Sequence, residues 1–162
     1  MSHLFKLWFD ILRLRSGPDT IPYSLALFKL SLIAHFITGI LLASFSLDLA
    51  SALIAALLGT LVMVAYCHLL LLLHRKQPRL IQTLTALAGC EVLLGVLSLP
   101  LAFWFQFGSG DQTLTAMLAL LILGWNLSVA GHIFRHATER NAVIGFLFAL
   151  GYITIALTLG GG

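Results

Sequence analysis

Five long apolar stretches follow one another along the chain, and short polar segments separate them. Each stretch is close to the roughly 20 residues that an α-helix needs to cross the hydrocarbon core of a bilayer. The pattern therefore predicts an all-α fold, a polytopic membrane bundle of about five transmembrane helices. The predicted spans cover residues 23–45, 49–73, 80–105, 113–134 and 142–159.

Residues 2–15, before the first span, have a different pattern. Polar side chains recur every three or four positions and form one stripe, while apolar side chains cover the remaining surface. The stripe consists of His3, Lys6, Asp10 and Arg13. This spacing predicts an amphipathic helix in the membrane interface. The residues expected at the boundary are Lys6, Trp8, Arg13 and Arg15. The alternative is a segment that packs on the other helices as a plug.

An elbow that contains Gly17, Pro18 and Pro22 follows this segment. Proline disfavours helical conformation in the residue before it, so the elbow separates the first helix from the first span. The predicted organisation is a cytoplasmic interfacial helix and elbow over residues 1–22 and a five-helix transmembrane domain over residues 23–162. We expect no cleavable signal peptide, because residues 2–15 lack a uniform apolar core before a small-residue cleavage site.

Composition supports the membrane interpretation. Hydrophobic residues make up 60% of the 162 residues and charged residues 9%, with a mean hydropathy of +1.04. Soluble domains are about 45–50% apolar and about 25% charged, and a soluble core of this size could not bury so many apolar side chains. Both cysteines, Cys67 and Cys90, lie within apolar stretches, so a structural disulfide framework is not expected.

The basic residues alternate with the spans. All nine Lys and Arg residues lie near the N-terminus and first span, in the 74–79 loop or beside the 135–141 loop, whereas the opposite loops carry Asp48 and Asp111. The positive-inside rule therefore predicts a cytoplasmic N-terminus and an outside C-terminus, most simply in a bacterial inner membrane. Because these basic residues follow the membrane side, the net charge of +3 does not indicate a nucleic-acid partner.

Ionisable and polar side chains inside the spans are the candidates for function, because they are expensive in a bilayer. Glu91 is the acidic residue predicted near the midplane, and it needs a partner or a proton. Its candidate partners are Lys29, His35 and His68. The functional interpretation is a proton or ion relay or a polar substrate site; the alternatives are a neutral Glu91 bonded between helices and a contact to another subunit. Asn126 and His132 are further intramembrane candidates.

Two histidine pairs raise the question of a cofactor. His68 and His132 could bracket a haem from two helices, and His132 and His136 share a helix face at i, i+4. No Cys or Asp in the loops completes a tetrahedral metal set, so we expect neither a metal nor a cofactor. Metalloprotease, phosphate-loop, rhomboid and intramembrane aspartyl-protease signatures are absent from the sequence, so we expect no enzymatic activity.

The segment from Trp125-Asn126-Leu127-Ser128-Val129 to Arg135-His136-Ala137, followed by a last apolar span, resembles the end of bacterial Yip-type domains. The segment from Arg13 to Pro22 is similar to their start. Yip proteins are Rab-interacting membrane proteins of about five spans, so the resemblance implies a role in membrane organisation or scaffolding. The chain lacks the long acidic cytoplasmic region of the eukaryotic members, and Rab binding is therefore not implied.

Three functions follow from these features. The first is a non-enzymatic membrane partner, scaffold or assembly subunit, which binds the bilayer and another protein or a second copy of itself. The second is a small proton- or ion-coupled transporter or channel subunit centred on Glu91, His35 and His68. The third is a haem-binding electron-transfer subunit that uses His68 and His132. Small residues mark places where helices can approach closely, for internal packing or for a dimer. They are Ser51, Ala55 and Gly59 in the second span, Gly89 and Gly95 in the third, Gly124 and Gly131 in the fourth, and Gly145 and Gly151 in the fifth.

Overall fold

The computed structural model describes residues 2–108 and 112–159, with side chains from residue 6 onward. This part of the chain is helical and contains no β-strand. Five helices are long and apolar enough to cross a membrane, as predicted. The helices are α1 (Ser2–Leu12), α2 (Leu25–Ala43), α3 (Leu49–Leu73), α4 (Leu80–Phe107), α5 (Gln112–Thr138) and α6 (Ala142–Leu159); short 3-10 turns, η1 (Pro18–Thr20) and η2 (Gln77–Arg79), precede α2 and α4.

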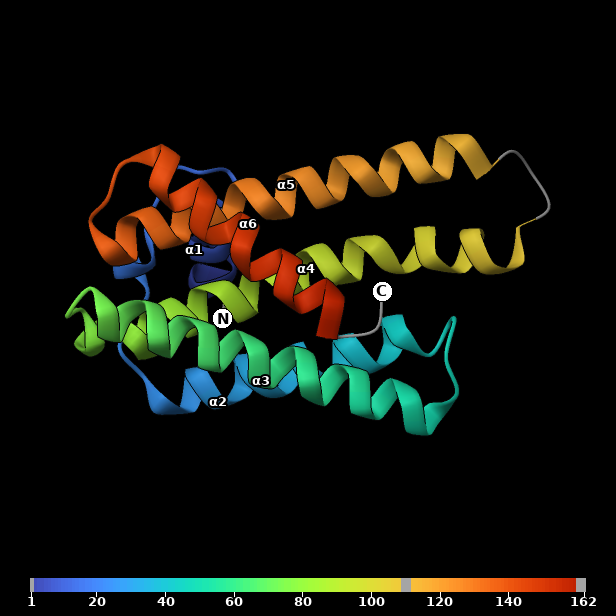
Figure 1. Ribbon diagram of the computed structural model, residues 1–162, viewed down its shortest axis with the longest axis horizontal. Coiled ribbons are helices and arrows are strands. Elements are labelled where there is room, and N and C mark those ends of the chain that lie inside the picture. Colours follow the sequence, from blue (N-terminus) through green and yellow to red (C-terminus); the bar gives the residue numbers. More distant parts are fainter. Residues whose placement is uncertain (1, 109–111, 160–162) are drawn as a thin grey trace.

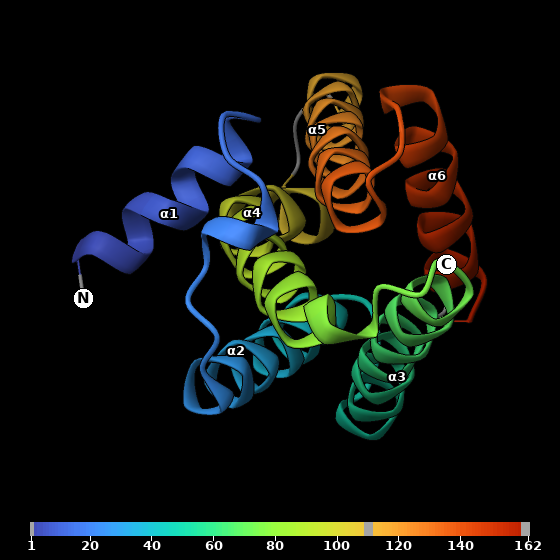
Figure 2. The ribbon, with the colours of Figure 1, turned by 90° about the vertical axis from the view of Figure 1, so that its left-hand side faces the viewer.

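Helix α4 lies at the centre of the bundle. Figure 2 looks along the bundle and shows the other helices arranged around α4. The cause is visible in the sequence of α4, where residues 83–90 are small or apolar and all of them are buried. Helix α6 crosses obliquely from α5 toward α3 and ends well short of the far ends of α4 and α5 (Figure 1).

The two ends of the bundle differ in charge. Residues 13–22, 74–79 and 139–141 gather at one end, which we call the basic end (Figure 1). There Glu139 forms ion pairs with Lys76 and with Arg79, whose Nη2 lies 2.6 Å from the carboxylate. The hydrogen bond from Lys76, and then the charges of Lys76 and Arg79, lower the pKa of Glu139. These contacts join the α3–α4 connection to the α5–α6 connection.

At the opposite end, Asp48 begins α3 as its N-cap. Its carboxylate accepts hydrogen bonds from the backbone N–H groups of Ala50, at 3.1 Å, and Ser51, at 3.2 Å. Such caps satisfy N–H groups that the first helical turn leaves unpaired. Hydrogen bonds from Ser51 are the main reason that the pKa of Asp48 is lowered.

Two tryptophan side chains join the N-terminal segment to the bundle: one donates from the segment to the backbone of α4, and the other donates from α5 to the backbone of the segment. The indole N–H of Trp8 donates to Thr85 O at 3.3 Å, and that of Trp125 donates to Leu12 O at 2.9 Å. Ile11 and Leu12 are buried against the bundle. The second half of α1 therefore packs on α4 and α5, as the plug alternative expects.

The elbow after α1 is held in the same way. His132 Nε2 bonds Ser16 O at 2.9 Å, and the Gln82 amide donates to Ile21 O at 2.8 Å. Because a carbonyl oxygen only accepts, His132 carries its proton on Nε2. Lys6, Arg13 and Arg15 are exposed, and their position in a membrane interface stays a prediction.

A glycine pair brings α5 and α6 into backbone contact. A Cβ atom added at Gly145 would lie 2.5 Å from Gly131 O and 2.6 Å from Arg135 Cβ, and one added at Gly131 would lie 3.2 Å from Phe146 Cα. Only residues without a side chain allow helices to approach so closely. The expectation that small residues mark helix contacts is confirmed at this crossing, but it is wrong at Gly59 and Gly124, where an added Cβ would meet no atom within 4 Å.

Candidate functional site

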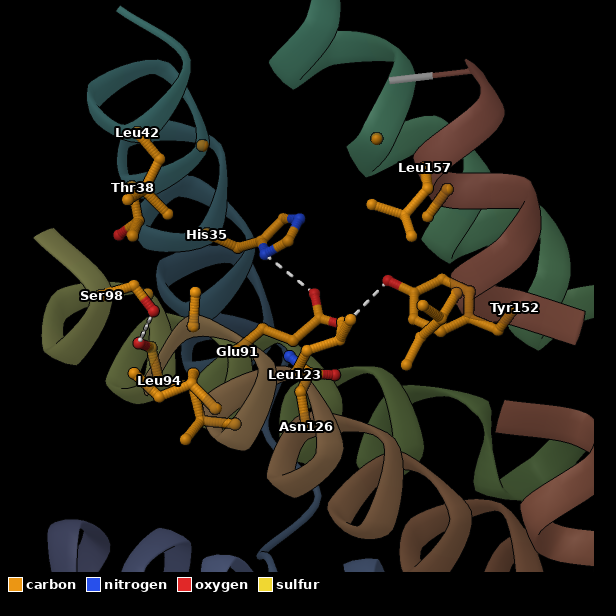
Figure 3. Close-up of a pocket in the computed structure, with 17 residues that line it drawn as sticks. His35, Thr38, Leu42, Glu91, Leu94, Ser98, Leu123, Asn126, Tyr152 and Leu157 are labelled. Carbon is orange, nitrogen blue, oxygen red and sulfur yellow. Dashed lines mark hydrogen bonds and ion pairs between the residues drawn. The ribbon is translucent and has the colours of Figure 1, made fainter. Parts of the chain in front are cut away.

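Glu91 lies where α2, α4 and α6 converge, and its side chain is 13% exposed. His35 Nδ1 of α2 lies 3.2 Å from Glu91 Oε2, and the Tyr152 hydroxyl of α6 donates to Glu91 Oε1 at 2.8 Å. Figure 3 shows the two partners reaching the carboxyl group from opposite sides. Each oxygen of the carboxyl group thus has one polar partner from a different helix.

The carboxyl group faces a cavity of about 400 Å³ that five helices line. Gly59, where an added Cβ would meet no atom within 4 Å, leaves room beside the cavity, and most of the cavity wall is apolar. The lining includes Leu42, Leu94, Ile122, Leu123, Ile153, Ala156 and Leu157. A cavity of this volume, with an apolar wall and a few convergent polar groups, is typical of sites for small molecules.

The polar groups of this cavity divide into two kinds. The hydroxyls of Thr38 and Ser98 donate to carbonyl groups of their own helices, at 2.8 and 2.9 Å. In the part of the chain that the structure describes, the side-chain amide of Asn126 has no hydrogen-bond partner. Glu91, His35 and Asn126 are therefore the groups that can orient a ligand, and they come from three different helices.

A second cavity, of about 340 Å³, continues from the first toward the end of the bundle opposite the basic end. The two share the lining residues Leu42, Ser98, Ala119 and Ile122. The second cavity reaches Ser46 and Gln106, lies between α2, α4 and α5, and has no lining residue from α6. Helix α6 ends short of the far ends of α4 and α5 (Figure 1), which agrees with its absence from this lining.

Toward the basic end the bundle is closed. Residues 83–90 of α4 are buried on every side, and His132, Phe134 and Ile133 of α5 are buried at the same end. The hollow at Glu91 therefore does not continue toward the basic end, and it adjoins the second cavity on the opposite side. This arrangement suits binding from one side better than open conduction through the bundle.

The structure brings together only some of the intramembrane residues that the sequence singled out. His35 meets Glu91, and Asn126 lines the same cavity. Lys29 and His68 are both exposed, and neither lines the cavity. Their depth along the spans made both of them candidate partners of Glu91, but the rotation of each helix points the side chain away from the cavity.

His132 lies elsewhere, at the elbow, where it bonds the Ser16 carbonyl. The ring centroids of His132 and His136 lie 4.6 Å apart, so the two histidines at i, i+4 are close. The Nε2 atom of His132, however, already bonds the Ser16 carbonyl. His68 is exposed on α3, and the described residues show no contact that joins it to His132. Within that part of the chain, no group of three or more His, Cys, Asp or Glu residues could hold a metal ion.

Tyr152 is the site residue that the sequence interpretation missed. It is 4% exposed and packs against Tyr66 and Phe134, with ring centroids 5.6 and 6.0 Å apart. A tyrosine within an apolar span is itself a signal, because a buried tyrosine hydroxyl needs a hydrogen-bond partner. The sequence does not say which of the intramembrane polar groups that partner is.

Comparison of the chain with protein-family models, with curated proteins and with solved structures gave no match. The interpretation of the site therefore depends on its own geometry. That geometry consists of a carboxyl–imidazole pair with a tyrosine hydroxyl and an amide, at the closed end of an apolar hollow.

Proposed function

We propose that this chain is a multi-pass membrane protein of five spans, with its N-terminus in the cytoplasm and its C-terminus outside. Exposed leucine, isoleucine and phenylalanine side chains cover the long helices, which favours a lipid environment because soluble monomers rarely expose large contiguous apolar patches. The basic loops gather at one end, as the positive-inside rule requires. An alkaline phosphatase fused to the C-terminus should be active and one fused to the N-terminus inactive. The reverse pattern would overturn this orientation.

We propose further that the protein is a non-enzymatic binding protein that holds a small ligand within the membrane, with the ligand's polar group at Glu91. The observation that carries this proposal is the position of the Glu91 carboxyl at the closed end of the hollow, beside His35 and Asn126. Evolution retains buried ionisable groups in membrane spans chiefly where they bind or relay something. The two adjoining cavities supply the space that a relay alone does not need.

Native mass spectrometry of the protein in mild detergent tests this proposal. Wild type should carry one small molecule per chain, and Glu91→Gln should lose it because the substitution removes the charge while keeping the size of the side chain. His68→Gln is the matched control, because His68 is exposed outside the cavity. Adding the identified ligand at 100 times its Kd should stabilise wild type by about 2.7 kcal/mol. A wild-type protein without any bound small molecule, or Glu91→Gln with unchanged occupancy, would refute the proposal.

A scaffold or assembly-subunit role is the second candidate, and α5 provides the observation that favours it. Residues 116–121 of α5 are all exposed; Ala119 among them lines the two cavities, and the other five are covered by no other part of the described chain. Crosslinking in intact membranes through a cysteine at Leu120 should then give a discrete adduct, whereas a cysteine at Ala137, which is buried, should not. Monomer at both positions would count against this role. The resemblance to Yip-type proteins remains a prediction.

A further inference from the structure

The charges that surround the hollow limit what it can bind. No Lys or Arg is among the described residues that line either cavity, and Glu91 is their one acidic residue. Three elements present titratable groups to Glu91 besides its own helix: α2 with His35, α6 with Tyr152 and α3 with Cys67, while Cys90 neighbours it on α4. Once it is ionised, Glu91 is the one negatively charged group that the site offers to a ligand, and the sign of this charge favours a cation.

The carboxyl–imidazole pair of Glu91 and His35 lies in a mostly apolar region. With one proton the pair is neutral overall, whether that proton is on His35 or on Glu91. Adding or removing a proton would leave a net charge inside a mostly apolar region, which is unfavourable. A cation that contacts the Glu91 carboxylate restores neutrality if the pair loses its proton at the same time.

The shape of the hollow adds a second requirement. Beyond Glu91 most of the wall is formed by aliphatic and aromatic side chains, and the second cavity extends it along Leu101, Phe105 and Ile122. The polar side chains of this part are Thr38, Ser46, Ser98, Gln106 and Thr115. An ion of a few ångströms would leave this length of apolar wall without contacts. An apolar chain attached to the cation fills it, in contact with α4 and α5.

We propose that the ligand of this site is an amphiphilic organic cation, whose charged group binds Glu91 in exchange for the proton of the His35–Glu91 pair and whose apolar chain occupies the second cavity. This inference rests on the proposed ligand-binding function. The step is balanced in charge: one positive charge enters with the ligand and one proton leaves to bulk water. Because binding releases one proton, the apparent Kd rises about tenfold for each pH unit of acidification while the pair remains singly protonated.

Three probes with the same twelve-carbon chain and different charge test this inference: dodecyltrimethylammonium, 1-dodecanol and dodecanoate. The protein is reconstituted in lipid nanodiscs, and binding is followed by the rise in thermal unfolding temperature and by proton release to a pH-indicator dye. We expect the cation to bind most tightly and to release about one proton per bound molecule. Glu91→Gln should lose at least tenfold in affinity for the cation and keep its affinity for 1-dodecanol, which also shows that the variant is folded. His68→Gln is the control and should match wild type.

The alternative outcomes separate this inference from the function on which it rests. If 1-dodecanol or dodecanoate binds wild type as tightly as the cation, or if the cation binds without proton release, the cation-exchange inference is wrong and the binding function stands. If none of the three probes binds, the inference is also wrong. The binding function is then judged by native mass spectrometry, which does not depend on these probes.

Discussion

Gly145 provides a direct test of the tertiary arrangement, because its missing side chain allows α6 to touch the backbone of α5. Alanine at this position would place its Cβ 2.5 Å from Gly131 O and 2.6 Å from Arg135 Cβ. Contacting carbon atoms prefer separations of about 3.5–4.0 Å, so the two helices must move apart by roughly 1 Å. A gap of that size forfeits a quarter to a half of the dispersion energy of each atom pair that it separates.

The expected cost of this overpacking is about 1–3 kcal/mol, of which the higher helix propensity of alanine returns about 0.5–1 kcal/mol. Gly124→Ala on α5 is the matched control, because a Cβ there meets no atom within 4 Å and the propensity gain acts alone. The difference between the two variants therefore isolates the helix contact. At about 2–4 °C per kcal/mol for a chain of this size, it corresponds to roughly 2–12 °C.

The assay uses the two cysteines of the protein. Cys67 and Cys90 are 0% and 1% exposed, so a fluorogenic maleimide reacts with them only after unfolding. We expect Gly124→Ala to unfold at or slightly above the wild-type temperature and Gly145→Ala clearly below it. Equal unfolding temperatures for the two variants would show that α5 and α6 do not meet at this glycine pair. The position of Tyr152, two turns further along α6, would then need revision.

Three further predictions concern other contacts. Gly89→Val places a side chain against the indole of Trp8, so hydrogen exchange of α1 should accelerate; unchanged exchange would contradict the docking of α1. The salt bridges of Glu139 lower its pKa below 4.5, so they stabilise the fold above about pH 4.5 and are lost as pH falls through the folded pKa; Glu139→Gln should remove that part of the acid dependence of unfolding. Tyr152→Phe removes the hydrogen bond to Glu91 and should destabilise the protein by about 0.5–1.5 kcal/mol in urea titration, and no change would argue against that bond.

The site shows how far sequence reasoning extends into a membrane bundle. The depth of a residue follows from its count along a span, because each residue of a helix rises 1.5 Å. Depth alone made Lys29, His35 and His68 equal candidates to meet Glu91. The structure selects His35, because α2 turns it inward while α3 turns His68 outward. Rotation about the helix axis depends on how neighbouring helices pack, and nearly uniform apolar helices carry little amphipathic signal of it.

By itself, the sequence determined the helices of this protein. Apolar stretches of membrane-spanning length, separated by short polar segments, leave the backbone little alternative, and the observed bounds of α3 and α6 equal the predicted ones. The fourth predicted span, residues 113–134, is shorter than the helix that contains it. Helix α5 continues to Thr138, because the polar residues after Phe134 still make helical hydrogen bonds. The tertiary structure alone decided which polar groups meet. Tyr152 is 61 residues from Glu91, and their hydrogen bond exists only because α6 crosses from α5 toward α3, a path that the Gly131–Gly145 contact permits.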